Sequence, residues 1–217
     1  EITSLTYKEM RELSYAGFNV FHDEALIPAF EAKIPVCIKN TNNPSAPGTM
    51  IVAEREPQKD CVVGIASDVG FCSLYVSKYL MNREVGFGRK LLQILEDENI
   101  SFEHMPSGID DISIIIRENQ LTEEKEQRII ERIKTELEVD TISLQKDLAV
   151  IMVVGEGMNS TIGVAKKATK ALAEANVNIE MINQGSSEVS MMFGIHVEGL
   201  ERAIRSLYAT YFGDHHA

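Results

Sequence analysis

The sequence predicts an α+β protein in which two similar units of the order β-α-β-β-α-β follow a shorter α/β segment. Two observations lead to this prediction. The chain repeats itself with an offset of 77 residues, and within each copy the apolar residues follow first the period of a strand and then that of a helix. The 217 residues are 44% hydrophobic, which is enough to build more than one core.

The repeat aligns residues 71–116 with residues 148–193 without a gap. A self-similarity of this length defines the structural unit of the chain. Ten aligned positions are identical, namely Val76/Val153, Met81/Met158, Asn82/Asn159, Gly86/Gly163, Lys90/Lys167, Leu95/Leu172, Asn99/Asn176, Glu103/Glu180, Gly108/Gly185 and Ser113/Ser190.

Each copy begins with alternating apolar and polar residues, which is the pattern of a half-buried strand. A polar loop then ends at a glycine, Gly86 or Gly163, and a helical pattern follows. We expect these helices to end near Asn99 and Asn176, because asparagine tolerates the left-handed conformation of a helix C-terminus. Their predicted apolar stripes are Phe87, Leu91, Ile94 and Leu95 in the first copy, and Val164, Ala168, Ala171 and Leu172 in the second.

A second strand, a turn and a third strand follow this helix in both copies. In the first copy we place the second strand at Ile100–Glu103, the turn at Pro106–Gly108 and the third strand at Ile112–Ile116. In the second copy the turn is expected at Asn183–Gly185 and the third strand at Val189–Ile195.

A second helix closes each copy, at about residues 121–137 with Thr122 as its N-cap, and at residues 199–212. The resulting order is that of the ferredoxin-like fold. Two helices cover one face of an antiparallel sheet in this fold, so sheet edges stay available for pairing with another chain.

Residues 1–57 do not belong to the repeat. They predict a helix at Tyr7–Tyr15, a second helix at Asp23–Lys33 that Pro28 interrupts, and a buried strand at Ile34–Ile38. A segment of this length is too short to form a stable core of its own, so we expect it to be the end of a larger domain.

Charge and cysteine content exclude several classes of protein. The net charge of −12 argues against a nucleic-acid partner or an anionic membrane surface, because both select basic patches. No apolar run is long enough to span a bilayer, and no secretory signal is visible. Cys37, Cys61 and Cys72 show no CxxC spacing, which argues against a disulfide framework or a zinc site and favours the cytoplasm. We expect no metal site.

Residues 7–52, YKEMRELSYAGFNVFHDEALIPAFEAKIPVCIKNTNNPSAPGTMIV, resemble the end of the catalytic domain of aspartokinases. The tandem repeat resembles the pair of ACT domains, small-molecule sensors, that follows that domain in the family. The resemblance divides the chain into a kinase-domain end with its linker, residues 1–57, a first ACT domain, residues 70–145, and a second ACT domain. The second domain combines residues 61–69 with residues 146–217, so the run Cys61–Ala66 is expected to pair with it.

The resemblance implies a parent enzyme that phosphorylates L-aspartate with MgATP. The family's lysine- and glycine-rich motif, its aspartate-binding residues and most of its ATP pocket have no counterpart here. We therefore expect no catalytic residue and no cofactor in this chain, and no kinase activity from the chain alone. Asn19 is the one position that the resemblance brings near a nucleotide, and the family usually has lysine there.

The resemblance also implies an amino-acid effector, with lysine first and threonine second. In ACT domains the backbone at the glycine-containing helix start binds the effector carboxylate, and a carboxylate on the following strand binds an ammonium group. Glu103 is that carboxylate here, expected opposite the loop Met81–Gly88. The predicted effector-binding residues are Met81, Asn82, Glu84, Val85, Gly86, Phe87, Gly88, Phe102, Glu103, His104, Ser107 and Gly108.

Other interpretations stay open. Glu103 and its repeat partner Glu180 are also what solvated charges on a sheet face would look like. The chain could be a freestanding amino-acid-binding or dimerisation module, or a separate regulatory subunit without kinase activity. We expect a homodimer through the ACT domains, with Phe71–Lys78 and Met81–Gly88 near its twofold axis, and a missing kinase domain as a further partner.

Overall fold

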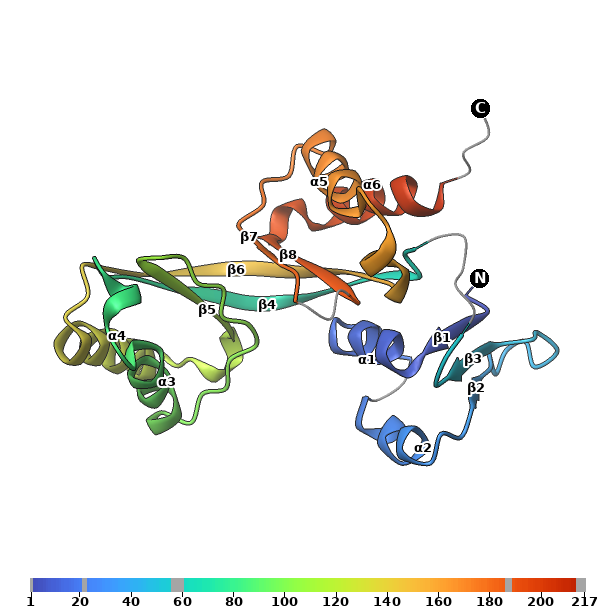
Figure 1. The fold of residues 1–217 in the computed structure, drawn as a ribbon, viewed down its shortest axis with the longest axis horizontal. Coiled ribbons are helices and arrows are strands. Elements are labelled where there is room, and N and C mark those ends of the chain that lie inside the picture. The colour runs from blue at the N-terminus through green and yellow to red at the C-terminus, as the bar shows by residue number, and fades with distance from the viewer. Residues whose placement is uncertain (1, 21–22, 56–60, 186–188, 214–217) are drawn as a thin grey trace. The chain divides into compact units, whose positions relative to one another are not determined.

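The computed structural model of the protein (Figure 1) describes residues 2–20, 23–55, 61–185 and 189–213. The chain divides into two compact units. One unit, residues 69–149, holds the first copy of the repeat and is called the first-repeat unit. The other, residues 1–68 and 150–217, holds the N-terminal segment and the second copy, and is called the second-repeat unit.

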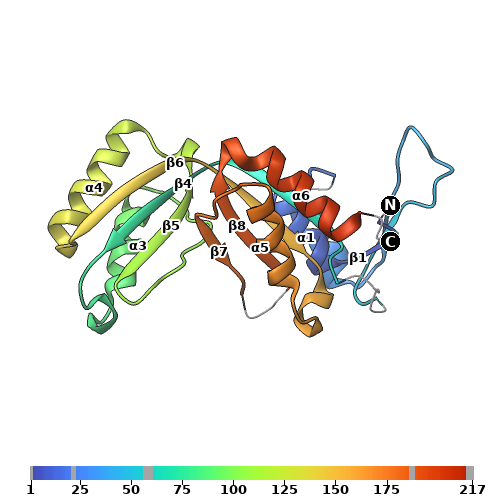
Figure 2. The same ribbon diagram turned by 90° about the horizontal axis from the view of Figure 1, so that it is seen from above.

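The first-repeat unit has the predicted order of elements, except that no regular strand forms between α3 and β5. They are the second part of β4 (Gly64–Ser77), η2 (Met81–Arg83), α3 (Phe87–Asp97), β5 (Asp111–Arg117), η3 (Glu118–Gln120), α4 (Glu123–Leu137) and the first part of β6 (Thr141–Val154). β4 and β5 are antiparallel, with Phe71 opposite Arg117 and Ser77 opposite Asp111, and β6 lies next to β4. Figures 1 and 2 show α3 and α4 together on one side of these strands.

The core of this unit lies between the strands and the two helices. All four predicted apolar residues of α3 are buried, and α4 contributes Ile129, Ile133 and Leu137 from its inner face. Thr122 caps α4 by accepting a hydrogen bond from the Lys125 N–H. Asn99 follows α3 with a φ of 53°, so the predicted left-handed end of this helix is confirmed.

The segment before β5 differs from the predicted strand and turn. Residues 103–108, which we call the hairpin arm, run antiparallel to β5 through the isolated bridges His104–Ile115 and Ser107–Ile112. The Glu103 N–H donates to the Ile115 carbonyl and the Ile115 N–H donates to the His104 carbonyl, each at 2.8 Å. Two residues thus oppose one, as in a β-bulge, which interrupts a regular strand.

The chain reverses later than the sequence predicts. The Gly108 N–H donates to the Asp111 carbonyl at 2.9 Å, so Ile109 and Asp110 form the turn rather than Pro106–Gly108. Pro106 instead lies within the arm, where its carbonyl accepts from the Ser113 N–H. A proline can occupy this place because only its carbonyl is needed for the pairing.

The second copy in the second-repeat unit repeats this order. Its elements are the end of β6, η4 (Glu156–Ser160), α5 (Val164–Glu174), β7 (Met181–Asn183), β8 (Ser190–His196), η5 (Val197–Gly199) and α6 (Leu200–Phe212). β8 lies between β6 and β7, and α5 and α6 cover one side of these strands (Figures 1 and 2). The predicted stripe of α5 is buried throughout. Asn183, expected in the turn, instead ends β7 opposite Met192, and residues 186–188 lie outside the described residues.

The two copies differ in the register of their hairpins. In the first copy Glu103 and His104 oppose Ile115. In the second copy the aligned residues Glu180 and Met181 oppose Gly194, whereas the residue aligned with Ile115 is Met192. A shift of two residues keeps each side chain on the same face of the sheet, so the core pattern survives the change.

The N-terminal segment forms a small sheet with helices in the second-repeat unit. Its elements are β1 (Ser4–Thr6), α1 (Tyr7–Tyr15), η1 (Asp23–Leu26), α2 (Ile27–Glu31), β2 (Val36–Ile38) and β3 (Thr49–Val52), and the strand order is β1-β3-β2. The boundaries of α1 are those predicted. Thr6 and Glu9 form a capping box at its start, and Met10 and Leu13 are buried.

Two predictions for this segment were wrong. Pro28 lies in the first turn of α2, where a missing N–H is harmless, so it starts a short helix instead of interrupting a long one. The strand near Ile34–Ile38 is not buried. β2 is an edge strand of its small sheet, Cys37 is exposed, and Ile34 is 58% exposed.

The run Cys61–Ala66 pairs with the second copy as expected, because the Val63 N–H donates to the Val154 carbonyl at 2.7 Å. From Gly64 onward it is continuous with β4 and is not a separate strand. Gly17, two residues after the end of α1, has a φ of 99°, and a Cβ there would lie 2.5 Å from the Ser67 carbonyl oxygen. Glycine is required at this close approach.

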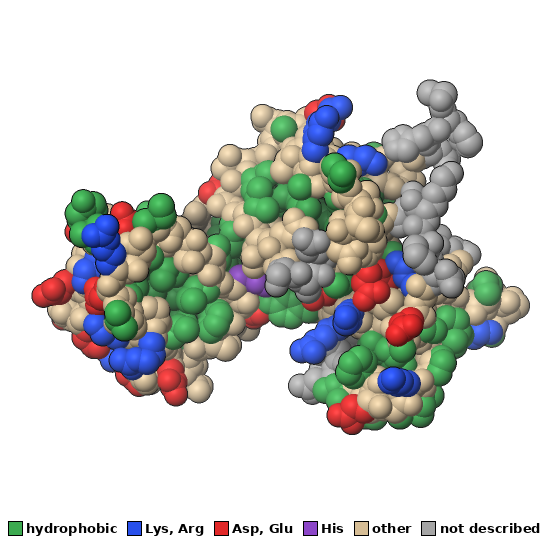
Figure 3. All heavy atoms as spheres, viewed as in Figure 1, with side chains coloured by type: hydrophobic (Ala, Val, Ile, Leu, Met, Phe, Trp, Pro, Cys, Tyr) green, Lys and Arg blue, Asp and Glu red, His purple; other side chains and the backbone are tan. Residues whose placement is uncertain are grey.

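The described part of the chain contains no helix that is long and apolar enough to cross a membrane. Figure 3 shows acidic and basic side chains interspersed over the surface that carries α3 and α4. Several of them form ion pairs, such as Arg128 with Glu98 at 2.8 Å. Such exposed pairs add little stability and mark an ordinary solvated surface.

Candidate functional site

The loop between β4 and α3 ends in an uncovered helix start. Gly86 precedes α3 with a φ of 82°, and no side chain caps the helix at this position. A Cβ placed on Gly86 or on Gly88 would meet nothing within 4 Å. The first N–H groups of α3 therefore adjoin open space. A helix start of this kind is suited to a carboxylate or another anion.

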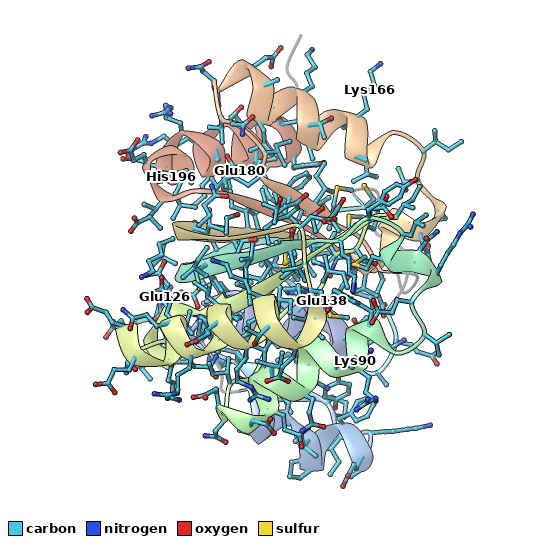
Figure 4. The ribbon with its side chains drawn as sticks, turned by 90° about the vertical axis from the view of Figure 1, so that its left-hand side faces the viewer. Lys90, Glu126, Glu138, Lys166, Glu180 and His196 are labelled. Atoms are coloured by element: carbon cyan, nitrogen blue, oxygen red, sulfur yellow. The ribbon has the colours of Figure 1, made fainter. Side chains whose placement is uncertain are left out.

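The charges around this helix start favour the same class of group. Glu84 forms ion pairs with Lys78 and with Lys90, each at 2.8 Å, and Lys78 also donates to the Leu137 carbonyl. Hydrogen bonds from Lys78 and Lys90 lower the pKa of Glu84, so its carboxylate stays ionised. Two ammonium groups thus face the Glu84 carboxylate near the positive end of α3, from which Lys90 projects (Figure 4).

Backbone contacts hold the start of this loop in place. The Tyr79 N–H donates to Asp140 Oδ2 at 2.6 Å, and the Asp140 N–H donates to the Ser77 carbonyl at 2.9 Å. The Lys78 N–H donates to the Asp110 carbonyl at 2.9 Å, which joins the loop to the tip of the hairpin. The loop is thus anchored at its first residues and open at its glycines.

Ser107 and Gly108 lie at the same end of the sheet. Ser107 bridges to Ile112, which is opposite Val76 of β4, and Gly108 is bonded to Asp111, which is opposite Ser77. The structure therefore gathers one group of the predicted effector-binding residues around the helix start, namely Met81, Asn82, Glu84, Val85, Gly86, Phe87, Gly88, Ser107 and Gly108.

Glu103 does not lie opposite this loop within one chain, contrary to the expectation from the sequence. It pairs with Ile115, which is opposite Ser73, whereas the loop starts after Ser77. Four residues along a strand correspond to about 13 Å. Phe102, Glu103 and His104 therefore form a second group at the other end of the hairpin.

Glu103 has an ionic partner within its own unit. Arg117 Nε lies 3.4 Å from Glu103 Oε1, and the Arg117 guanidinium lies 4.1 Å from the centre of the Phe71 ring. The Glu103 side chain is 17% exposed and that of Arg117 is 28% exposed. A half-buried carboxylate with a stacked arginine is not the freely solvated charge of the alternative interpretation.

A hollow of about 570 Å³ lies near this second group, at the C-terminal end of α3. Gln120 shapes it by accepting from the Ser101 N–H at 2.9 Å and donating to the Ser101 carbonyl at 3.0 Å. Its volume is in the range of small-molecule pockets. Sequence reasoning missed this hollow, because Gln120 is 19 residues from Ser101 in the chain and belongs to no motif. It is lined by Leu92, Leu95, Glu96, Asn99, Ile100, Ser101, Phe102 and Gln120.

The second copy lacks three of the charged groups of the first. At the positions aligned with Lys78 and Glu84 it has Gly155 and Thr161, and Gly194 aligns with Arg117. Glu180, labelled in Figure 4, is exposed and accepts a hydrogen bond from Asn178 Nδ2 at 2.8 Å. The helix start after Gly163 is preserved, with a φ of 91°, but its surroundings are not.

Asn19 lies in an exposed turn, where its N–H donates to the Gly17 carbonyl at 2.9 Å. No group of three or more His, Cys, Asp or Glu side chains in the described ranges is arranged to hold a metal ion.

Comparison with known proteins finds an ACT domain and aspartokinase relatives. The ACT domain matches residues 151–211, most of the second copy. Aspartokinase 3 of Bacillus subtilis is 60% identical over 212 residues, which are 98% of this chain and 47% of that protein. The chain is an aspartokinase homologue. It spans about half the length of that relative.

Solved structures of aspartokinases have the same fold as this homologue. Aspartate kinase of Clostridium acetobutylicum, described as an allosteric enzyme, superposes with a TM-score of 0.91 and 44% identity over 97% of this chain and 48% of its own. Aspartokinase III of E. coli is 22% identical. Its complex with aspartate and ADP gives a TM-score of 0.81 over 98% of this chain and 47% of its own. Its complex with lysine and aspartate gives a TM-score of 0.77 over 98% of this chain and 46% of its own.

Proposed function

We propose that this aspartokinase homologue is the regulatory part of an aspartate kinase, where it binds an end-product amino acid and thereby lowers the phosphorylation of aspartate. The observation that carries the proposal is the uncovered start of α3, with left-handed Gly86 and the flanking Lys78 and Lys90. This arrangement suits the carboxylate of an amino acid. The allosteric character stated for the C. acetobutylicum relative supports the proposal.

Lysine is the proposed effector and threonine the second candidate. An amino acid bound by its carboxylate at α3 presents its ammonium group, or groups, to the rest of the site. Lysine has two ammonium groups, so it benefits from a nearby carboxylate such as Glu103 more than threonine does. The position of Glu103, about 13 Å along the sheet from the loop, exceeds the length of a lysine side chain.

A homodimer resolves this separation. β4 is an inner strand of its unit, with β5 and β6 beside it, so its backbone is not available to pair with a second chain. The hairpin arm lies beyond β5 and offers an outer side instead. Pro106 bonds inward to β5 through its carbonyl, so the outward-facing backbone groups are those of Met105 and Ser107. Pairing two arms about a twofold axis at Pro106 sets Met105 of each chain opposite Ser107 of the other chain, and brings Glu103 near Gly108 of the other chain and so near its α3 start.

Calorimetry with lysine and with threonine tests the proposal on the 217-residue chain. Glu103→Gln should weaken lysine binding by at least about tenfold, since truncating one member of a half-buried charge pair leaves the other unpaired. Glu180→Gln is the matched control in the second copy and should change the affinity little. Absence of lysine and threonine binding to the unsubstituted chain would refute the effector role. Equal losses from both substitutions would mean that the two copies are equivalent sites.

Two further parts of the proposal concern the parent protein. Aspartate phosphorylation with MgATP requires residues outside this chain, so a coupled assay of the chain alone should show no aspartate-dependent turnover. Measurable turnover would contradict this. The three cysteines are free thiols, which supports the proposed cytoplasmic location.

A further inference from the structure

Glu9 of α1 is a fully buried carboxylate with partners from three parts of the second-repeat unit. It accepts from the Thr6 N–H at 2.9 Å, from Arg55 Nε at 3.0 Å and Nη2 at 2.6 Å, and from the Glu156 N–H at 2.9 Å. Thr6 precedes α1, Arg55 follows β3, and Glu156 begins the loop before α5. A buried charge persists only when it is paired in this way.

The bond from Glu156 has a counterpart in the first copy. Glu156 aligns with Tyr79, whose N–H donates to Asp140 Oδ2 at 2.6 Å. Both copies therefore use a carboxylate to anchor the first turn of the same loop. The anchoring carboxylates come from different parts of the chain. Asp140 belongs to the first-repeat unit itself, whereas Glu9 comes from the N-terminal segment.

Further contacts join the loop of the second copy to its surroundings. The Gly155 N–H donates to the Val189 carbonyl at 2.8 Å. A Cβ at Gly155 would lie 1.9 Å from the Cys61 carbonyl oxygen, so the backbone of Cys61 lies directly against this residue. The loop that would bind an effector in the first copy is thus packed against other parts of the chain in the second.

We infer that Glu9 couples the N-terminal segment to the second copy, and that loop 155–163 serves as the attachment point of this segment rather than as an effector site. This inference rests on the proposed function only in taking the N-terminal segment as the end of the catalytic domain. A movement of the second copy then reaches α1 through one carboxylate, because Glu9 binds both the Glu156 backbone and Arg55.

Amide hydrogen exchange on the 217-residue chain tests the contact itself. In Glu9→Gln the amide of Glu156 should exchange at least about tenfold faster, since its charged acceptor is lost, while Tyr79 is unchanged. Asp140→Asn is the matched control and should give the reverse pattern. Unchanged exchange at Glu156 in Glu9→Gln would overturn the assigned contact.

The coupling role is tested in the full-length protein by measuring lysine binding and lysine inhibition separately. Glu9→Gln should leave the lysine dissociation constant within about twofold and raise the concentration for half-inhibition at least about tenfold. A purely structural role would change the lysine dissociation constant and the half-inhibition concentration by the same factor. An equal change in both quantities, or no change in either, would refute the inference. If the unsubstituted protein does not bind lysine, that result would instead refute the proposed function.

Glu9→Gln combined with Arg55→Gln guards against misfolding, because it removes both buried charges together. If the double variant folds, as judged by circular dichroism, it should also bind lysine without full inhibition. Full inhibition in this folded variant would again overturn the coupling role.

Discussion

Arg117 lies 3.4 Å from Glu103 and is stacked over Phe71, so the carboxylate that we assign to an effector ammonium group already has a cation of its own. An effector that binds Glu103 must compete with this arginine. The free energy gained from the effector contact is reduced by the loss of the internal pair. Arg117 therefore sets how strongly the site can attract a cationic amino acid.

Replacing Arg117 should strengthen lysine binding. In Arg117→Gln the side chain can still cover Phe71 but no longer neutralises Glu103, so the lysine affinity should rise by about threefold or more, a modest factor because the pair is partly exposed. Calorimetry against lysine measures this. Arg128→Gln, which breaks the pair with Glu98 between α4 and the end of α3, is the control and should have no effect. A weaker lysine affinity in Arg117→Gln would show that the arginine contacts the effector instead of competing with it.

The stability of the second-repeat unit should depend on the ionisation of Glu9. Burial alone would raise the pKa of Glu9, but hydrogen bonds from Arg55, Thr6 and Glu156 outweigh it and hold the pKa below its ordinary value of 4.5. A lowered folded-state pKa adds stability that is present above pH 4.5 and is lost as the pH falls through the folded pKa. Acid should therefore remove the contribution of this carboxylate.

Thermal unfolding of the unsubstituted chain and of Glu9→Gln checks this between pH 7 and pH 3. The unsubstituted chain should be more stable at neutral pH, and the difference should shrink as the pH falls below about 4.5. Glu201→Gln, in the exposed pair with Arg205, should show no such trend. A difference that is constant over the pH range would contradict the ionised state of Glu9.

The thiols of Cys37 and Cys72 should differ strongly in reactivity. Burial in the core of the first-repeat unit raises the pKa of Cys72 to about 12, so its thiolate is scarce at neutral pH, whereas Cys37 is exposed. Titration with a disulfide reagent at pH 8 should label Cys37 rapidly and Cys72 only after denaturation. The variant Cys37→Ser should lose the fast phase. Rapid labelling of Cys72 in the native chain would show that this core opens readily.

The elements of the two repeats follow from the sequence because local signals agree with the tertiary packing. The stripe from Phe87 to Leu95 and the left-handed residue Asn99 report burial and helix termination directly. The hairpin arm does not, since Glu103 and His104 form a bulge that depends on pairing with Ile115. The exposed edge strand β2 shows the same limit, because a run of apolar residues does not specify whether anything covers it.

The candidate site was predictable only in part. The helix start after Gly86 is visible as a glycine that precedes a helical pattern. The pair Glu103–Arg117 depends on the register of two strands, and the bond from Glu156 to Glu9 joins residues 147 positions apart. Sequence spacing carries no information about contacts of that kind.

The chain should form a dimer through the hairpin arm, and the effector site should be shared between the two chains of the dimer. The arm presents an outer side with no strand of its own unit beside it among the described residues, which favours pairing with a second chain. Sedimentation should show a dimer at tens of micromolar. A proline cannot donate a backbone hydrogen bond, so Met105→Pro, next to Pro106, should weaken the dimer.

Two variants, each defective in one half of the site, distinguish a shared site from a site within one chain. Glu103→Gln removes the ammonium partner. Gly88→Asp places a carboxylate at the start of α3, where the structure leaves room for a side chain and the added charge should exclude the effector carboxylate. Either variant alone should bind lysine weakly, because both sites of its homodimer are defective.

A heterodimer that contains one chain of each variant should recover one intact site. In a shared arrangement, one of its two sites combines both substitutions and the other combines neither. Co-expression with two different tags and sequential purification yields this heterodimer. Calorimetry should then give about one lysine per dimer with near-native affinity, since the intact site is unaltered. Weak binding in the heterodimer would show that Glu103 and the start of α3 belong to a site within one chain or to no common site. The arm-to-arm dimer would then play no part in effector binding.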